Sequence, residues 1–244
     1  MAASSCGGAV GPADEAPREA RPAFYALTPG GWRDYVTLLH VPYTAWHLAY
    51  VVVGGCLVAD VAWGRLGLTV LAFALAMGIG AHALDELQGR PLRTTIPSRV
   101  LVALAVLSVV AACVIGIAVV LETTLWLLPL IALGAFLVPA YNLELLGGRV
   151  HTDLGFALAW GAFPVVTAFV AQASTLRVEA VLAATWATLL SLAQRRLSTQ
   201  VRRLRRGVGA SEEERRLAEA PESALKLLAA STVAVAAALV ALRL

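Results

Sequence analysis

Three side chains that could hold a metal ion together lie close to one another in this 244-residue chain. His82, Asp85 and Glu86 stand at positions i, i+3 and i+4, so a helix would place them on one face, where they could ligate one cation. They close a long apolar stretch, and carboxylates at a helix C-terminus are disfavoured unless a positive charge compensates them. That charge would come from a metal ion or from an arginine. A buried ion pair with Arg90, Arg93 or a more distant arginine is an equally open alternative.

More polar side chains recur near the ends of other apolar stretches. They are Asn142, Glu144, His151, Asp153, Gln194, Arg195 and Arg196. Further upstream, His40, Tyr43, Thr44 and His47 repeat at helical spacing and form a polar stripe along one helix face. Because contact with lipid would make such a stripe costly, we expect it to face the interior of a helical bundle.

The elements that must position these side chains are transmembrane helices. Hydrophobic residues make up 59% of the chain and charged residues 14%, and the mean hydropathy is +0.76, outside the usual range of soluble domains. The apolar stretches lack strand alternation, and they have the length of about 20 residues that a helix needs to cross hydrocarbon. The predicted fold class is therefore all-α, a polytopic transmembrane bundle of about seven spans. The spans are expected at residues 36–59, 66–86, 99–121, 123–143, 153–173, 177–196 and 223–242.

The sequence divides into a short tail and one membrane domain. Residues 1–22 are small, polar and Pro-rich, without the apolar segment of a signal peptide, so they predict a disordered tail that is not cleaved. Residues 23–244 are predicted to form the transmembrane helical domain. Within it, residues 197–222 are expected to form a cytoplasmic loop, in which Ser211 and Glu214 cap a short surface helix that ends before Pro221.

The distribution of basic residues predicts the orientation in the membrane. An N-terminus in the cytoplasm leaves only Arg65, Arg177 and Arg243 outside, which is a strong positive-inside asymmetry and places the C-terminus outside. The protein is thus expected to be integral to the membrane, the plasma membrane if the cell is prokaryotic. The basic run at residues 195–216 is expected to contact anionic lipids, and residues 24–35 to lie at the membrane interface. The basic run lacks interleaved aromatic residues, which argues against nucleic acid as a partner.

The second apolar stretch and the loop after it resemble the first signature of the UbiA superfamily of membrane prenyltransferases. That signature is usually N-D-x-x-D-x-x-x-D followed by R-P-I-P-S-G. Asp85 takes the position of the central metal-binding Asp, and Arg93 that of the loop arginine, ahead of Ile96, Pro97 and Ser98. Residues 140–169 are similar to the family's fourth and fifth helices, with a Tyr near the cytoplasmic end, a short basic loop and a Gly-rich helix that contains Pro.

The chain also departs from the family pattern. Ala81 and His82 occupy the N-D positions, and Gly89 replaces the last Asp of the first signature. The second acidic cluster of the family is absent, because SLAQRRLSTQVRR at residues 191–203 contains no carboxylate. The family usually has nine spans, whereas seven are expected here.

The resemblance implies a UbiA-like fold and transfer or cyclisation of the prenyl group of a prenyl diphosphate at a cytoplasm-facing pocket. In such chemistry Mg²⁺ and basic side chains stabilise the charge that develops on the diphosphate. The expected catalytic residues are Asp85, Glu86 and Tyr141, and the expected ligands of the ion are Asp85, Glu86 and His82. The expected substrate-binding residues are Arg93, Asn142, Arg195, Arg196, Arg202 and His47.

Two other functions fit the same residues. Loss of the second acidic cluster would leave a catalytically degenerate protein that binds an isoprenoid or another lipid. Alternatively, the four histidines, together with Asp85 and Glu86, would bind a transition metal such as Zn or Fe, for which imidazole is a suitable ligand.

Overall fold

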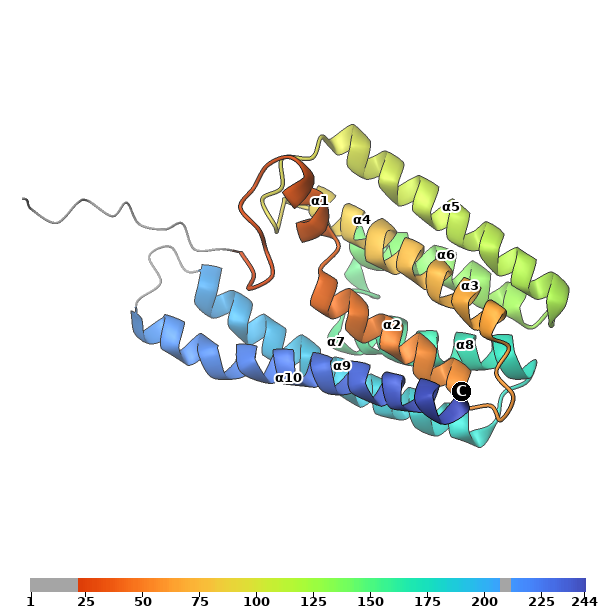
Figure 1. The fold of residues 1–244 in the computed structure, drawn as a ribbon. Coiled ribbons are helices and arrows are strands. Elements are labelled where there is room, and N and C mark those ends of the chain that lie inside the picture. Colours follow the sequence, from red (N-terminus) through yellow and green to blue (C-terminus); the bar gives the residue numbers. More distant parts are fainter. Residues whose placement is uncertain (1–21, 207–211) are drawn as a thin grey trace, which may run out of the picture.

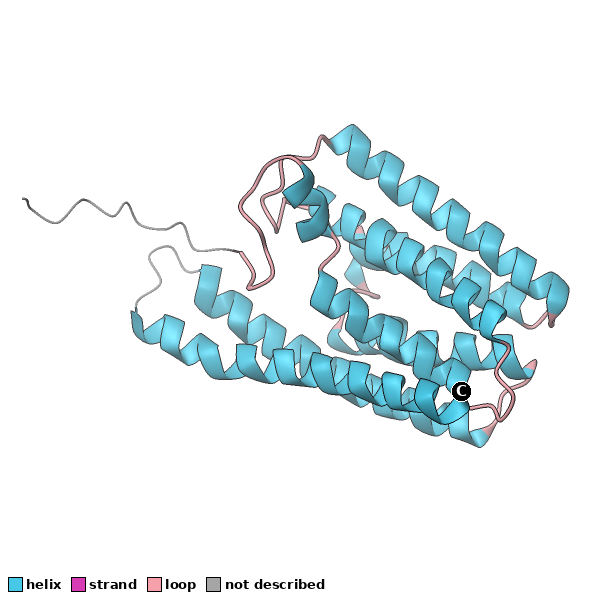
Figure 2. Ribbon diagram, in the orientation of Figure 1, coloured by secondary structure: helices cyan, strands magenta, loops and turns pink. Residues whose placement is uncertain are grey.

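The described part of the protein, residues 22–206 and 212–244 of a computed structural model, consists of helices and loops and contains no strand (Figure 2). The all-α prediction is thereby confirmed. The predicted disordered tail falls almost entirely on residues 1–21, which lie outside the described residues, as does Ser211 of the predicted helix cap.

The helices pack side by side into one bundle (Figure 1). Their bounds are α1 Trp32–Leu38, α2 Val41–Cys56, α3 Trp63–Phe73, α4 His82–Leu87, α5 Ser98–Glu122, α6 Leu127–Asn142, α7 Asp153–Ala157, α8 Phe163–Ala173, α9 Val178–Arg206 and α10 Glu212–Arg243. A π-helical segment, η1 (Ala74–Ala81), joins α3 to α4, and a second, η3 (Leu158–Ala162), joins α7 to α8. A short 3₁₀ turn, η2 (Leu146–Gly148), follows α6.

Four helices of the described chain are long and apolar enough to cross a membrane: Trp63–Leu87, Ser98–Glu122, Asp153–Ala173 and Arg216–Arg243. The bent pair of α1 and α2, which meet at 44°, raises this number to five if the two form one span. α6 is shorter, with 16 residues and a length of about 24 Å at 1.5 Å per residue. All seven stretches that the sequence marks as apolar are largely helical, and the structure supports a membrane protein with four or five such helices.

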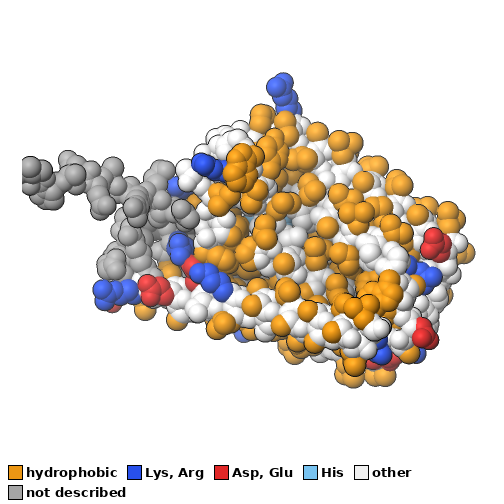
Figure 3. All heavy atoms as spheres, viewed as in Figure 1, with side chains coloured by type: hydrophobic (Ala, Val, Ile, Leu, Met, Phe, Trp, Pro, Cys, Tyr) orange, Lys and Arg blue, Asp and Glu red, His pale blue; other side chains and the backbone are white. Residues whose placement is uncertain are grey.

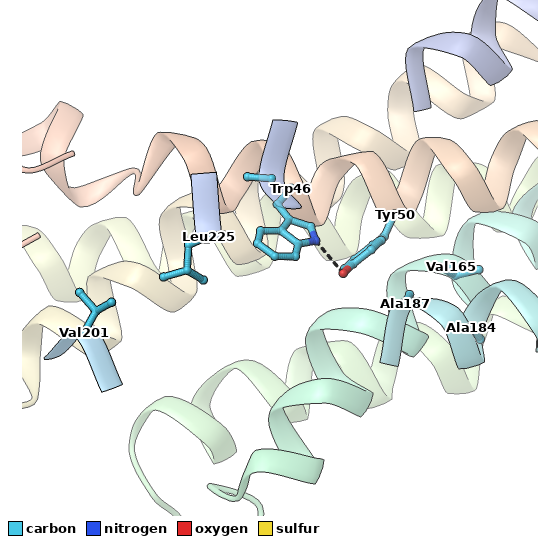
Figure 4. Close-up of a cluster of buried hydrophobic side chains, with 8 residues drawn as sticks. Trp46, Tyr50, Val165, Ala184, Ala187, Val201 and Leu225 are labelled. Carbon is cyan, nitrogen blue, oxygen red and sulfur yellow. Dashed lines mark hydrogen bonds between the residues drawn. The ribbon is translucent and has the colours of Figure 1, made fainter. Parts of the chain in front are cut away.

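α2 lies at the centre of the bundle, packed against α8 and α10, while α9 pairs with α10 along one edge (Figure 1). Trp46 and Tyr50 of α2 are fully buried, and the indole Nε1 of Trp46 donates to the Tyr50 hydroxyl at 2.7 Å (Figure 4). A Cβ on Gly54 would lie 2.3 Å from the carbonyl oxygen of Val165 in α8, so the close approach of α2 and α8 requires glycine there. This contact fixes the helix that carries most of the predicted polar stripe.

The surface of the bundle has the distribution expected for a protein embedded in lipid. Figure 3 shows hydrophobic side chains over the middle of one face, with charged side chains gathered toward the two ends. Large apolar residues are exposed on α5 and α6, among them Val106, Leu107, Val114 and Phe136. Because water would disfavour so much exposed apolar surface, hydrocarbon is the solvent that suits this face.

The predicted end of the short surface helix before Pro221 is wrong. α9 continues to Arg206, and α10 runs without interruption through Pro221. A proline inside a helix removes one backbone hydrogen bond, yet here the flanking turns are held by tertiary contacts. Leu225 is buried in the core, and Glu222 pairs with Arg205 of α9 and with Lys226. Packing against α9 therefore outweighs the local tendency of proline to end the helix.

Candidate functional site

A cavity of about 460 Å³, referred to below as the polar cavity, lies at the end of the bundle where α4 and α6 finish. Seven of the predicted site residues line it. They come from four helices: His47 of α2, His82 and Asp85 of α4, Tyr141 and Asn142 of α6, and Arg195 and Arg202 of α9. The wall thus carries two guanidinium groups, the carboxylate of Asp85 and, nearer the surface, that of Glu144.

Glu86, a predicted metal ligand, does not line the polar cavity, and its carboxylate is bonded to the protein itself. Its side chain is 0% exposed. One carboxylate oxygen accepts the Leu92 amide at 3.0 Å, and the other accepts the amide and the hydroxyl of Thr94, both at 2.9 Å. Neighbouring helical residues are about 100° apart around the axis. Asp85 consequently faces the cavity, whereas Glu86 anchors the loop after α4.

Arg93 and Arg196, both predicted to bind phosphate, also lie outside the polar cavity. Arg93 is exposed in the loop with a positive φ of 57°. Arg196 is exposed on α9, next to Arg195 but turned about 100° away. The arginine that organises the loop is Arg90, which donates to the Ile96 carbonyl at 2.6 Å and to the Ser98 hydroxyl at 2.9 Å.

All four histidines of the chain line the polar cavity. Three of them place Nδ1 at hydrogen-bond distance from a backbone carbonyl, which can only accept, so Nδ1 carries the proton and Nε2 of the neutral ring is an acceptor. The pairs are His47 with Trp160 at 2.9 Å, His82 with Gly78 at 3.1 Å and His151 with Tyr141 at 3.0 Å. Trp160 and Gly78 belong to the π-helical segments η3 and η1, a form of helix that is frequent at functional sites.

Arg195 is held in a defined position beside His151. Its Nε donates to Asp153 Oδ1 at 3.2 Å, and its Nη2 lies 3.3 Å from Nε2 of His151. Its guanidinium carbon also lies 5.6 Å from the centre of the Phe156 ring. These contacts fix the side chain and leave Nη1 without a partner among the described residues, so the group can donate to a guest in the cavity.

Three side chains at the polar cavity each have one buried polar atom that lacks a hydrogen-bond partner within the described chain. They are His40 (Nε2), Tyr141 (the hydroxyl oxygen) and Gln194 (Oε1). A buried polar atom without a partner costs about 1–3 kcal/mol. Three such atoms leave the side chains around the polar cavity incompletely hydrogen-bonded in the part of the chain that the structure describes.

A second, apolar cavity of about 100 Å³, referred to below as the apolar cleft, lies between α3, η1, α5, α6 and α8. Its walls are almost wholly hydrocarbon, with Phe73, Ile131 and Phe163 among the lining side chains. Met77 and Trp160 line both the apolar cleft and the polar cavity. The two spaces are therefore neighbours, separated by shared side chains.

The geometry does not fit the predicted metal site. No group of three or more His, Cys, Asp and Glu side chains within residues 22–206 and 212–244 is arranged to hold a metal ion. The Glu86 carboxylate accepts hydrogen bonds from the loop after α4, and the His82 ring stacks on His40 with the ring centres 4.0 Å apart. Asp85 is the member of the predicted triad that keeps a carboxylate at the polar cavity.

Sequence reasoning did not anticipate that the segment at residues 22–25 closes one side of the polar cavity. Phe24 and Tyr25 line it, and both rings pack edge-on against Tyr43 of α2. Lys226 of α10 lies with Nζ 4.8 Å from the centre of the Phe24 ring. The aromatic residues Phe24 and Tyr25 are the sequence signal for this role, although the pattern of residues 24–35 predicts a segment at the membrane interface.

Comparison with known protein families, with curated proteins and with solved structures found no match for this chain.

Proposed function

We propose that this protein binds a prenyl diphosphate or a related isoprenoid lipid with an anionic head, and that it acts on the prenyl group by transfer or cyclisation. The observation that carries the proposal is that the polar cavity, with two arginines, shares Met77 and Trp160 with the apolar cleft. An amphipathic molecule needs such a pair of adjoining spaces. A soluble anion would not fill the apolar cleft, and a neutral hydrocarbon would not pair with the arginines.

The head group is assigned to the arginine side of the polar cavity. Guanidinium groups match the geometry of phosphate oxygens and remain charged in proteins. Arg195 and Arg202 both line the cavity from α9, two turns apart, so one diphosphate could contact both.

The tail is assigned to the apolar cleft. Its lining extends along α6 from Val138 to Leu127, a rise of about 16 Å at 1.5 Å per residue. That distance is about half of the ~30 Å hydrocarbon core of a bilayer. A prenyl tail of moderate length would thus replace lipid in the cleft and keep its head at the polar cavity.

The proposal includes the UbiA-like fold and the seven-span topology implied by the sequence. In it, α6 and the first half of α9 also cross the membrane, and the basic end of α9, with the polar cavity, faces the cytoplasm with the N-terminus. The Asp85 position and the loop anchored by Glu86 follow the order of the family's first signature.

Mg²⁺ has no step in this proposal, because the predicted ligands do not gather around one point. This finding favours a second candidate function, an isoprenoid-binding protein without catalysis. The absence of carboxylates in residues 191–203 supports the same alternative. A transition-metal enzyme built on the histidines finds no comparable support, since no group of three or more His, Cys, Asp and Glu side chains in the described residues is arranged to hold a metal ion.

Binding of farnesyl diphosphate and farnesol to protein purified in detergent tests the proposal. Farnesyl diphosphate should bind at least about ten-fold more tightly than farnesol, and Arg202→Gln should remove most of that difference, because a charge-assisted hydrogen bond is worth about 1.5–3 kcal/mol. Arg196→Gln is the matched control, since Arg196 is exposed on the same helix outside the cavity. Equal affinities for the two ligands, or equal effects of the two variants, would refute the proposed head-group site.

Release of diphosphate separates the enzyme from the binding protein. The enzyme should release diphosphate from farnesyl diphosphate, and Asp85→Asn should reduce the rate without abolishing binding. Tight binding with no release, in the presence or absence of Mg²⁺ and with a range of nucleophilic acceptors, would leave the binding protein as the function.

A further inference from the structure

The four histidines of the polar cavity differ in what their Nε2 atoms contact. Gln194 lies 3.4 Å from Nε2 of His47, and Arg195 lies 3.3 Å from Nε2 of His151, so both acceptors are already used. Nε2 of His40 is enclosed by protein. Of the four, His82 alone has an Nε2 that makes no hydrogen bond to the described chain and is not enclosed.

The orientation of the His82 ring is fixed. Its Nδ1 lies 3.1 Å from the Gly78 carbonyl, and its face stacks on His40 with an angle of 28° between the ring planes. His40 is itself held by Tyr25, whose ring centre lies 5.1 Å away. Because His82 is half-buried and lines the polar cavity, the lone pair of Nε2 opens onto that cavity as a preorganised acceptor.

The polar cavity has room for more than a diphosphate. Its volume of about 460 Å³ falls in the range of sites that hold whole small molecules, about 300–1,000 Å³. The arginines line it from α9, which packs against α7 and α10, whereas His82 lines it from α4, which packs against α5 and α6. Donors for an anion and an acceptor for a proton-bearing group thus come from different walls.

We propose that Nε2 of His82 accepts the hydroxyl of a second, small substrate that occupies the polar cavity beside the prenyl diphosphate. The inference rests on the proposed function for the identity of the first substrate, but the hydroxyl site itself depends only on His82. In a transfer reaction the bond between the prenyl carbon and the diphosphate oxygen breaks, and the diphosphate keeps the electron pair. The hydroxyl oxygen then forms the new bond to the prenyl carbon, and its proton passes to Nε2 of His82.

Three naphthalene probes of similar shape test this inference in the purified protein without any diphosphate present. 1-Naphthol can donate a hydrogen bond, 1-methoxynaphthalene can only accept one, and naphthalene can do neither. A site built on His82 should prefer 1-naphthol about three- to ten-fold over both of the others, since one hydrogen bond is worth that factor. Recognition of the oxygen by Arg195 or Arg202 would instead leave 1-methoxynaphthalene nearly as tight as 1-naphthol, which would overturn the inference.

Variants assign the preference to one side chain. His82→Phe keeps a ring that can stack on His40 and should abolish the preference for 1-naphthol, whereas His82→Gln keeps an acceptor and should retain part of it. Asp85 is a second acceptor one turn along α4, and Asp85→Asn should leave the preference in place if His82 accepts the hydroxyl. Loss of the preference in Asp85→Asn alone would assign the hydroxyl to Asp85 and refute the role of His82.

Failure of this inference and failure of the proposed function give different results. If the protein shows no preference for 1-naphthol over the other two probes but binds farnesyl diphosphate as expected, the hydroxyl site is wrong and the proposed function stands. If the protein prefers 1-naphthol but binds farnesyl diphosphate no more tightly than farnesol, the hydroxyl site stands and the proposal of a prenyl diphosphate as the first substrate is wrong. Should His82→Phe fail to fold, His82→Gln and Asp85→Asn together still decide which of the two side chains accepts the hydroxyl.

Discussion

Replacing Glu86 by Gln should destabilise the protein whether or not a metal ion is present. The carboxylate is fully buried and accepts three hydrogen bonds, one from the Leu92 amide and two from Thr94, at 2.9–3.0 Å. The side-chain amide of the Glu86→Gln variant keeps one acceptor oxygen. Its NH₂ group, however, faces a donor whose hydrogen bond the carboxylate accepts in the unaltered protein. At least one charge-assisted hydrogen bond is lost in either orientation of the amide.

The size of the effect follows from that single bond. A hydrogen bond to a charged group contributes about 1.5–3 kcal/mol. For a chain of this size about 1 kcal/mol corresponds to a change of roughly 2–4 °C in Tm, so Glu86→Gln should lower Tm by about 3–12 °C. Glu86→Ala leaves all three donors without an acceptor, at a cost of about 3–9 kcal/mol. That cost is comparable to the ~5–15 kcal/mol of total stability of a typical protein, so little folded protein is expected.

Thermal unfolding in detergent, followed by tryptophan fluorescence, measures the change in Tm, and limited proteolysis reports on the loop at residues 88–97. Glu122→Gln is the control, because Glu122 is an exposed glutamate at the end of α5 and its loss should change stability by less than about 0.5 kcal/mol. The reasoning would be refuted if Mg²⁺ raised the Tm of the unaltered protein and Glu86→Gln removed that increase. The carboxylate would then bind the ion and not the loop.

Three further outcomes are expected from the packing of the helices. Gly54→Ala should lower Tm strongly, because its Cβ would meet a backbone carbonyl of α8 at 2.3 Å, whereas Gly67→Ala on α3 meets no atom within 4 Å and should be neutral or stabilising; equal effects would contradict the close α2–α8 contact. Ala135→Phe, in the apolar cleft, should weaken binding of farnesyl diphosphate but not of inorganic diphosphate, and the neighbouring exposed Ala132→Phe should change neither. Pro221→Ala should raise Tm, since it restores a hydrogen bond inside α10, and a fall in Tm would support a helix break at this position.

The fold class was accessible from the sequence because it depends on local composition. Apolar stretches of about 20 residues have few ways to satisfy their backbone groups in lipid other than a helix. The positions of polar residues also indicated one end of the bundle as the site. Spacing alone, however, treated Asp85 and Glu86 as one unit, and Arg195 and Arg196 as another.

The same spacing could not decide which of two adjacent residues faces inward. Residues one apart differ by about 100° around a helix, so the edge of a cavity can pass between them. In α4 that edge lies between His82 and Asp85 on one side and Glu86 on the other. The π-helical segment η1 adds to the uncertainty, because its wider turn rotates every residue that follows it.

Composition and periodicity by themselves determined that the chain is an all-helical membrane protein with its histidines and arginines directed to shared polar faces. The tertiary structure decided which side chains meet: the loop that takes the Glu86 carboxylate, the segment at Phe24 and Tyr25 that closes the polar cavity, and the continuation of α10 through Pro221. Each of these depends on contacts between residues distant in sequence or in separate elements. The free energy of these contacts is larger than that of the local conformational preferences on which a sequence pattern depends. They are therefore seen only in the packed molecule.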